Sequence, residues 1–195
     1  MILILGGFLL GGVPFSLLLP KWILKKDICA LSPDHNPGAG NVFTLCGIPM
    51  GFACLLLDLG KGFLPVAWAA RQISLHSPVF ALVLAAPVLG HAIGPFNGFL
   101  GGKCIATSFG VLLGLLPECY ASFVLAGCYI FFSIALVIRP HARRSIAAFG
   151  VFALISVPWL LIQHRAALAL GCLLVAGTAI WKHWGEALDS GTTTS

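Results

Sequence analysis

Residues 48–70 read IPMGFACLLLDLGKGFLPVAWAA, an apolar run that is interrupted by one acidic and one basic residue. A helix needs about 20 predominantly apolar residues to cross the hydrocarbon core of a bilayer. This run has that length, and it therefore predicts a transmembrane helix. The fold depends on how many such runs the rest of the chain contains.

The composition of the whole chain is typical of a membrane protein. Of the 195 residues, 59% are hydrophobic and 9% are charged, and the mean hydropathy is +1.02. An average soluble domain carries roughly 25% charged residues. The longest polar stretch, residues 27–41, has only the length of a loop. We therefore expect one integral-membrane domain over residues 1–190, followed by a short disordered tail over residues 191–195.

The apolar runs predict an all-α polytopic membrane protein with about seven transmembrane helices. The runs cover residues 2–24, 48–70, 78–94, 104–116, 119–138, 146–162 and 166–181. The first run lacks a preceding cationic segment, so we expect a retained helix and not a cleaved signal peptide. The fourth run is short enough to be tilted or partly re-entrant.

The distribution of Lys and Arg predicts the orientation of these helices. If the N-terminus lies outside, the cytoplasmic connections hold eight Lys and Arg residues, and the external connections hold only Arg71 and Arg165. Cytoplasmic loops carry the excess of basic residues in membrane proteins. We therefore expect the N-terminus outside and the C-terminus in the cytoplasm, with three polar segments on the cytoplasmic side: residues 34–41, 98–104 and 182–186.

The sequence argues against nucleic-acid binding and against a metal site. The net charge of +5 and the pI near 9.0 come from basic residues at the ends of apolar runs, where they act as topology anchors. We interpret four further residues in the same way, as topology anchors that can also attract anionic lipid or substrate: Arg139, His141, Arg143 and Arg144. None of the seven cysteines has a partner at the close spacing of a zinc or redox motif. We expect no metal and no cofactor.

The sequence G101-G-K103 precedes an apolar run and suggests a phosphate site. Gly101 and Gly102 allow close approach of the backbone, and the following helix offers free N–H groups and the positive end of its dipole. Lys103 adds a cation. Cys104 stands where a P-loop has Ser or Thr, so the full nucleotide motif is absent. The alternative is a positive-inside anchor beside a tight turn.

The loop D34-H-N-P-G-A-G-N41 is a second candidate ligand site. Asn36 and Asn41 supply amide donors and acceptors, and Gly38 permits close approach of the backbone. A plain turn rich in Asn, Pro and Gly is the alternative, and composition alone favours it. His35 is a candidate general base, although adjacent residues such as Asp34 and His35 rarely point at each other.

Three further groups of ionisable residues lie within or beside the apolar runs. Asp58 and Lys61 are three positions apart and predict a structural ion pair, because lone charges are costly in a membrane. His91 ends the third run close to the glycine turn, and it is either a hydrogen-bonded structural group or a ligand contact. The same two interpretations apply to His183 and Glu186 after the last run.

Several of these motifs, taken in order, resemble one family: the bacterial integral-membrane glycerol-3-phosphate acyltransferases that use acyl phosphate, the PlsY type. G11-G-V-P-F15 resembles the family's G-S-I-P-F, and residues 35–47 resemble its G-N-x-G-A-T-N-x-x-R-x-x-G. D58-L-G-K-G62 resembles D-x-x-K-G. L89-G-H91 followed by residues 95–107 resembles L-G-H and P-x-F-x-G-F-K-G-G-K-G-x-A-T.

The resemblance implies a seven-span enzyme of the bacterial inner membrane with its site on the cytoplasmic side. The implied reaction moves a fatty acyl group from acyl phosphate to glycerol 3-phosphate and gives lysophosphatidate for phospholipid synthesis. We expect Lys103, His35 and His91 to act in catalysis and the protein to be monomeric. The residues expected to bind substrate are Asn36, Gly38, Asn41, Gly101, Gly102 and His183.

The chain also departs from the family pattern at five positions. Asp34 replaces the family's serine, Gly40 its threonine, Thr44 its arginine, Leu100 a lysine and Glu186 an asparagine. The loss of a basic residue and the gain of an acidic one should weaken binding of a dianionic acceptor. Two alternatives therefore stay open: acylation of a different acceptor, or a non-enzymatic protein that binds or translocates a phosphorylated lipid.

Overall fold

The computed structural model describes residues 1–192, with side chains described as far as Leu188. Within these residues the protein consists of helices and connecting turns, which confirms the predicted all-α class. The helices are α1 (Ile2–Gly12), α2 (Phe15–Leu24), α3 (Ile28–Leu31), α4 (Ala39–Cys46), α5 (Ile48–Ala69), α6 (Pro78–Ile93), α7 (Ile105–Leu113), α8 (Ala121–Ile130), the π-helical η1 (Phe131–Ala135), α9 (His141–Ile162) and α10 (Ala166–Thr192).

The first apolar run forms two helices instead of the single helix predicted. α1 and α2 meet at an angle of 42°. Pro14 lacks an amide hydrogen and disfavours a helical conformation of the residue before it. Val13 is accordingly extended, with φ −65° and ψ 120°.

The lengths of the helices support three or four complete membrane spans. α5, α9 and α10 are each long and apolar enough to cross a bilayer, and the bent pair of α1 and α2 is a fourth candidate. α6 and the combined α8 and η1 are shorter, and α7 has only nine residues.

The last helix is longer than the apolar run predicted. α10 continues through residues 182–186, which we had expected to follow the span as a separate polar segment. The predicted disordered tail begins inside this helix, at residues 191–192, and its remaining residues, 193–195, lie outside the described part of the chain.

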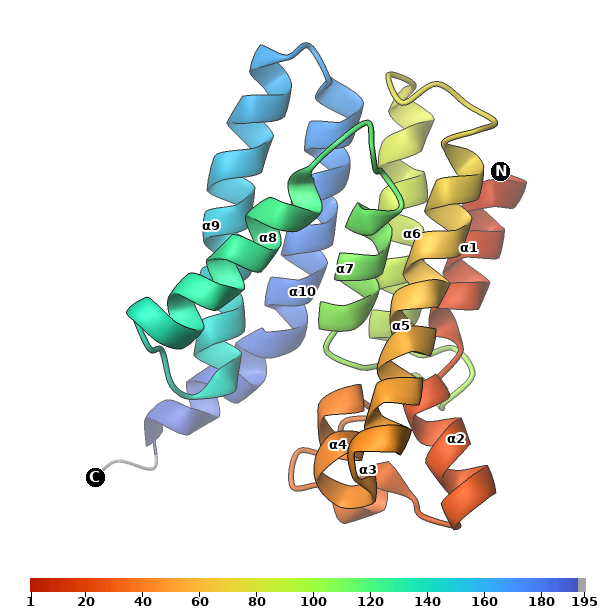
Figure 1. Ribbon diagram of the computed structural model, residues 1–195, viewed down its shortest axis with the longest axis vertical. Helices are drawn as coiled ribbons and strands as arrows, with labels where there is room; N and C mark the ends of the chain where they lie inside the picture. The colour runs from red at the N-terminus through yellow and green to blue at the C-terminus, as the bar shows by residue number, and fades with distance from the viewer. Residues whose placement is uncertain (193–195) are drawn as a thin grey trace.

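α6 occupies the centre of the bundle and packs against α1 on one side and α10 on the other (Figure 1). α9 covers α10, and α5 packs against α7. The approach of α5 and α7 depends on two glycines. A Cβ at Gly62 would overlap the carbonyl oxygen of Thr107, and a Cβ at Gly110 would overlap that of Leu59. These two helices form the walls of the cavity described below.

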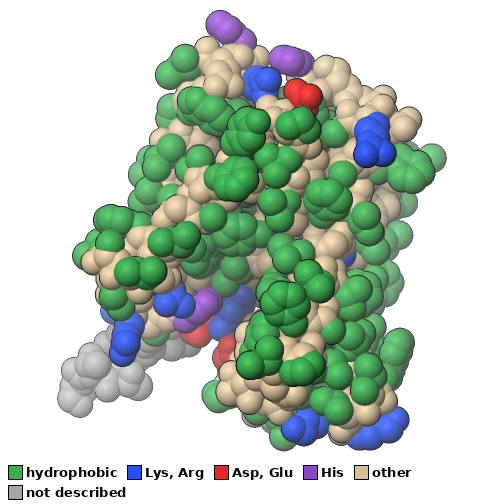
Figure 2. Space-filling view, in the orientation of Figure 1, with side chains coloured by type: hydrophobic (Ala, Val, Ile, Leu, Met, Phe, Trp, Pro, Cys, Tyr) green, Lys and Arg blue, Asp and Glu red, His purple; other side chains and the backbone are tan. Residues whose placement is uncertain are grey.

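The charged residues gather at the two ends of the bundle, and hydrophobic side chains cover its flanks (Figure 2). Many large apolar residues on these flanks are exposed, such as Leu56, Leu154 and Ile162. An apolar flank between polar ends is the surface that a bilayer requires. One end holds α2, α3, α4 and the C-terminal part of α10, whereas Met1 lies toward the opposite end (Figure 1).

Candidate active site

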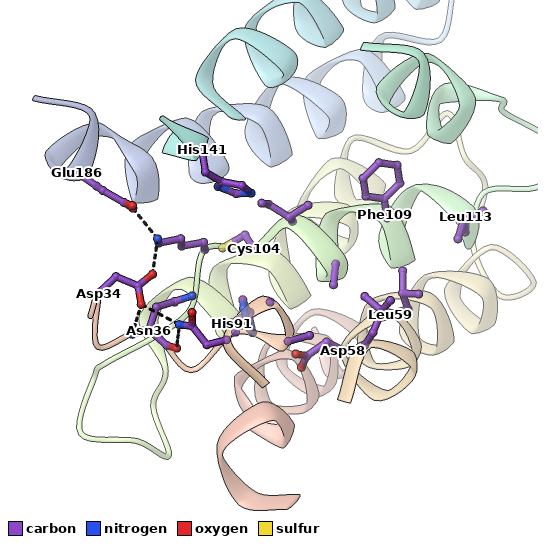
Figure 3. Close-up of a pocket in the computed structure, with 18 residues that line it drawn as sticks. Asp34, Asn36, Asp58, Leu59, His91, Cys104, Phe109, Leu113, His141 and Glu186 are labelled. Atoms are coloured by element: carbon purple, nitrogen blue, oxygen red, sulfur yellow. Dashed lines mark hydrogen bonds and ion pairs between the residues drawn. The ribbon is translucent and has the colours of Figure 1, made fainter. Parts of the chain in front are cut away.

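A cavity of about 760 Å³ opens at the end of the bundle that holds α4 and the C-terminal part of α10. Its polar residues are Asp34, Asn36, Asn41, Asp58, His91, Lys103, His141 and Glu186. Its apolar wall comes from α5 and α7 and consists of Leu55, Leu59, Ile105, Ala106, Phe109 and Leu113. In Figure 3 Phe109 and Leu113 lie well away from Asp34 and Glu186. The cavity therefore has a charged end and an apolar end.

Lys103 lies at the charged end, between two carboxylates. Its Nζ lies 2.6 Å from Oδ2 of Asp34 and 2.6 Å from Oε2 of Glu186. Asp34 comes from the loop between α3 and α4, and Glu186 comes from α10 (Figure 3). The lysine thus joins three segments that are distant in sequence, and its side chain is only 17% exposed.

The loop before α4 holds Asp34 in place through its own amides. Asn41 donates from Nδ2 to Oδ1 of Asp34 at 2.8 Å and to the carbonyl oxygen of Asn36 at 2.9 Å. The backbone N–H of Asn36 donates to the same Oδ1 at 3.3 Å. The two asparagines and Gly38, which we expected to bind substrate, line the cavity, and both N–H groups of the Asn41 amide are used within the loop.

The two charges in this contact stabilise each other. Burial lowers the pKa of Lys103, but hydrogen bonds and charges of Asp34 and Glu186 outweigh it and leave the pKa above its ordinary value of 10.5. Burial raises the pKa of Asp34, but Lys103 and Asn41 outweigh it and leave the pKa below 3.8. Both residues are therefore charged at neutral pH.

A second polar cluster lies deeper, where α2, α5 and α6 meet. Lys61 Nζ lies 2.8 Å from Oδ1 of Asp58, which confirms the predicted ion pair. It also donates to the carbonyl oxygen of Val13 at 2.8 Å and lies 2.7 Å from Nδ1 of His91. Ser16 donates to the other oxygen of Asp58 at 2.6 Å. The pair ties the bend of the first span to α5 and to the His91 ring that lines the cavity.

The cavity therefore combines a lysine, two asparagines, two histidines and three carboxylates with an apolar wall. A family model described as Glycerol-3-phosphate acyltransferase matches residues 1–188. The chain belongs to this glycerol-3-phosphate acyltransferase family. It is accordingly a membrane enzyme of phospholipid synthesis that acts as a glycerol-3-phosphate acyltransferase.

Curated relatives and solved structures agree with this membership. The glycerol-3-phosphate acyltransferase of Myxococcus xanthus is 35% identical over 95% of this chain and 93% of its own length. That of Pseudomonas aeruginosa is 35% identical over 93% of this chain and 90% of its own length. A crystal structure of PlsY, an integral membrane glycerol 3-phosphate acyltransferase in its glycerol 3-phosphate form, matches with a TM-score of 0.81 and 27% identity. The match covers 97% of this chain and 92% of that one.

The glycines of the acyltransferase motif act in packing at this site. A Cβ at Gly101 would overlap the carbonyl oxygen of Ala92, and one at Gly102 would overlap the ring of His91. The N–H of Gly102 also donates to the carbonyl oxygen of His91 at 3.0 Å. The two glycines thus let the loop lie against the end of α6, and this contact holds Lys103 at the mouth of the cavity.

Two histidines that we expected at the site, His35 and His183, are not among the residues that line the cavity. Nδ1 of His35 lies 2.8 Å from the carbonyl oxygen of Cys29, so its ring contacts the preceding helix α3. His183 is fully buried in α10, and its Nδ1 lies 2.8 Å from the carbonyl oxygen of Ala179. His183 reaches the site through His141, since the two ring centroids are 6.0 Å apart.

Sequence reasoning missed two features of the acyltransferase cavity. His141 was interpreted as a topology anchor, but it lines the cavity because α9 begins there, earlier than its apolar run suggested. The apolar wall was also missed, although α7 carries Ile105, Phe109 and Leu113 at helical spacing, which puts them on one face.

Proposed function

We propose that this acyltransferase takes its acyl group from acyl phosphate and transfers it to glycerol 3-phosphate in the cavity around Lys103. The observation that carries this proposal is the two-part lining of the cavity, with a lysine and two asparagines at one end and an apolar wall at the other. A fatty acyl phosphate has the same division, because its phosphate is strongly polar and its chain is entirely apolar. The solved relative in the glycerol 3-phosphate form supports the choice of acceptor.

In this proposal the ammonium of Lys103 holds the phosphate of the donor. An ammonium has three N–H donors, and Asp34 and Glu186 occupy two of them. The third is available to a phosphate oxygen within the cavity. Because the phosphate leaves with the electron pair of the broken bond, a fixed cation beside it stabilises the transition state more than the ground state.

The acceptor is assigned to the side of the cavity formed by Asn36, Gly38 and Asn41. His91 lines the cavity nearby, and its Nδ1 faces the ammonium of Lys61, so this nitrogen accepts a hydrogen bond and Nε2 carries the ring proton. His91 is thus proposed as a hydrogen-bond donor to substrate. His183 is proposed to act indirectly, by holding the ring of His141.

The chemical step needs no enzyme nucleophile. The hydroxyl oxygen of the acceptor forms a bond to the acyl carbonyl carbon, and the bond from that carbon to the phosphate oxygen breaks. The phosphate leaves with the electron pair, and the hydroxyl proton moves to a phosphate oxygen of the donor or the acceptor. The protein supplies alignment of the two substrates and electrostatic stabilisation.

The apolar wall of α5 and α7 is proposed to hold the acyl chain. Leu59 from α5 and Phe109 and Leu113 from α7 face the cavity. Each buried methylene of a fatty chain contributes about 0.8 kcal/mol, so a long chain gains most of its binding free energy here.

The proposed topology has the N-terminus outside, seven crossings and a cytoplasmic active site. In this proposal the seven crossings are α1 with α2, then α5, α6, α7, α8 with η1, α9 and α10, in the order in which the chain forms them (Figure 1). The excess of Lys and Arg in the connections at the end with the cavity supports the cytoplasmic assignment. We further propose that the protein is a monomer.

The experiment that tests this function uses the purified protein in lipid bilayers with palmitoyl phosphate and glycerol 3-phosphate. Formation of lysophosphatidate together with inorganic phosphate supports the proposal. Binding of palmitoyl phosphate without phosphate release would instead favour a non-enzymatic lipid-phosphate binder.

A further inference from the structure

Two carboxylates contact Lys103, and the structure holds them to different extents. Oδ1 of Asp34 accepts from Nδ2 of Asn41 at 2.8 Å and from the N–H of Asn36 at 3.3 Å, so its own loop fixes this side chain. Among the described residues, Lys103 is the only hydrogen-bond or ion-pair partner of Glu186 (Figure 3). Glu186 is also the more exposed of the two, at 39% against 28%. It is therefore the carboxylate that an incoming anion can replace.

We propose that the phosphate of the acyl donor displaces Glu186 from Lys103, and that the released carboxylate moves to Lys182. The inference rests on the proposed binding of the donor phosphate to Lys103. It deepens that function by making Glu186 an internal competitor of the phosphate, which regulates how tightly donor and product are held.

Repulsion between like charges favours the displacement. A phosphate with one organic substituent carries close to two negative charges at neutral pH. Two anions that accept from neighbouring N–H groups of one ammonium lie about 4 Å apart, and like charges at that distance repel each other. Departure of Glu186 relieves this repulsion. The phosphate then accepts from two N–H groups of Lys103 in place of one, and both contacts are charge-assisted.

Lys182 offers the released carboxylate a second partner. It lies four residues before Glu186 in α10, and residues at this spacing are neighbours on one face of a helix. Among the side chains that the structure describes, Lys182 has no carboxylate partner, and its Nζ lies 5.6 Å from the ring centroid of Trp181. Exchange of one lysine for the other conserves a charge-assisted contact for Glu186.

The exchange requires rotation of one side chain and no movement of the helix. Nε of Arg143 donates to the carbonyl oxygen of Ala187 at 3.4 Å, and this contact holds the last turns of α10 against the start of α9. Glu186 lies on this held part of α10. Its backbone can therefore stay in place while its carboxylate moves between the two ammonium groups.

The competition has a consequence for turnover. Acyl transfer leaves inorganic phosphate on Lys103, and return of Glu186 to the lysine promotes release of that phosphate. Removal of the carboxylate should therefore tighten phosphate binding and strengthen inhibition by the product.

The test measures the binding of hexyl phosphate by calorimetry to the wild-type protein, to Glu186→Gln, to Lys182→Met and to the double variant. Hexyl phosphate carries the phosphate and a short alkyl chain, and it lacks the carbonyl group that acyl transfer needs, so it binds without turnover. Lys103→Ala identifies the heat that comes from this site. Asp27→Asn is the matched control, because it removes one exposed carboxylate at the same end of the bundle, outside the cavity lining (Figure 1). A thermal melt shows that each variant is folded.

We expect Glu186→Gln to bind hexyl phosphate about tenfold more tightly than wild type, and Asp27→Asn to bind it as wild type does. Lys182→Met should weaken binding in the wild-type background and have little effect in Glu186→Gln, because no carboxylate then needs a second partner. Equal or weaker binding by Glu186→Gln would overturn the displacement. Equal effects of Lys182→Met in both backgrounds would overturn the move to Lys182.

Failure of the proposed acyl transfer gives a different result. The wild-type protein would then bind hexyl phosphate but form no lysophosphatidate from palmitoyl phosphate, and the affinities alone would decide the inference. If acyl transfer does occur, inorganic phosphate should inhibit Glu186→Gln at about tenfold lower concentration than wild type. Absence of Lys103-dependent binding in every protein of the series would overturn the inference outright.

Discussion

The Nζ of Lys103 lies 2.6 Å from Oδ2 of Asp34, although 69 residues separate them in the sequence. This contact joins the loop before α4 to the loop before α7 beside the cavity. It also means that the cation proposed to bind phosphate is already paired with carboxylates before substrate arrives. The stability and the activity of the site should both reflect this arrangement.

The ion pair between Asp34 and Lys103 should stabilise the protein over a wide pH range. The pKa of Asp34 is lower in the folded protein than its ordinary value of 3.8. Its contribution to the free energy of unfolding is therefore fully present above pH 3.8 and is lost as the pH falls through the pKa of the folded state. The pKa of Lys103 is higher in the folded protein than its ordinary value of 10.5. Its contribution to the free energy of unfolding is therefore fully present below pH 10.5 and is lost as the pH rises through the pKa of the folded state.

We therefore predict that Asp34→Asn lowers stability by about 1 kcal/mol between about pH 5 and pH 9, with a constant difference from wild type. The two proteins should converge in strong acid, below the folded pKa of Asp34. Thermal melts in detergent across this pH series measure the difference. A difference that changes steadily between pH 5 and pH 9 would contradict the assigned directions of the two pKa shifts.

Replacement of Lys61 by Met should be among the most destabilising single changes. It would leave the buried carboxylate of Asp58 without its cation and would remove the donor to Val13 and His91. Breaking a buried pair in this way costs about 3 to 5 kcal/mol. Thermal melts should show the loss, and Lys25→Met, at an exposed lysine, is the control.

The double variant Asp58→Asn with Lys61→Met tests the cause of that loss. It should be more stable than Lys61→Met alone, because it removes the uncompensated charge. If the double variant loses as much stability as the two single variants lose together, the two residues do not act as a pair.

The sequence predicted those parts of the structure that depend on local pattern. The apolar runs predicted the all-α class, although the first run forms two helices and the last helix is longer than its run. The i, i+3 spacing of Asp58 and Lys61 predicted their ion pair, because this spacing places two residues on one face of a helix. The grouping of Lys103 with Asn36 and Asn41 in one cavity followed from membrane topology, which puts their loops on one side.

The remaining features depend on tertiary contacts that no local pattern encodes. Glu186 meets Lys103 only because α10 continues past its apolar run, and polar residues in a helix beyond the bilayer carry no hydropathy signal. The engagement of His35 with Cys29 depends on the conformation of one loop, where His35 has a φ of 48°. The break at Pro14 was signalled by the proline itself and was overlooked within a long apolar run.

Close packing of α5 and α7 should be necessary for the shape of the cavity. Gly110→Ala would force a Cβ against the carbonyl oxygen of Leu59 and separate the two helices. We predict a destabilisation of about 1 to 3 kcal/mol and reduced turnover. Gly60→Ala is the matched control, because a Cβ there has nothing within 4 Å. Equal effects of the two variants on the melting temperature would argue against the helix contact as the cause.

The apolar end of the cavity should determine which acyl chains fit. Leu113→Trp would fill this end and should reduce kcat/KM for a 16-carbon acyl phosphate about tenfold relative to a shorter one, since several methylenes would lose their contacts. Leu56→Trp, on an exposed face of α5, is the control. The measurement is phosphate release over a series of chain lengths. An unchanged chain-length profile in Leu113→Trp would show that the chain binds elsewhere.

The most direct test of the central claim is the rate of lysophosphatidate formation by Lys103→Ala in bilayers, compared with wild type and with the distant control Arg71→Ala. Loss of the only cation proposed to contact the leaving phosphate should reduce kcat by about 100-fold or more, while the variant stays folded in a thermal melt. Arg71→Ala should retain full activity. Wild-type turnover by folded Lys103→Ala would contradict the account.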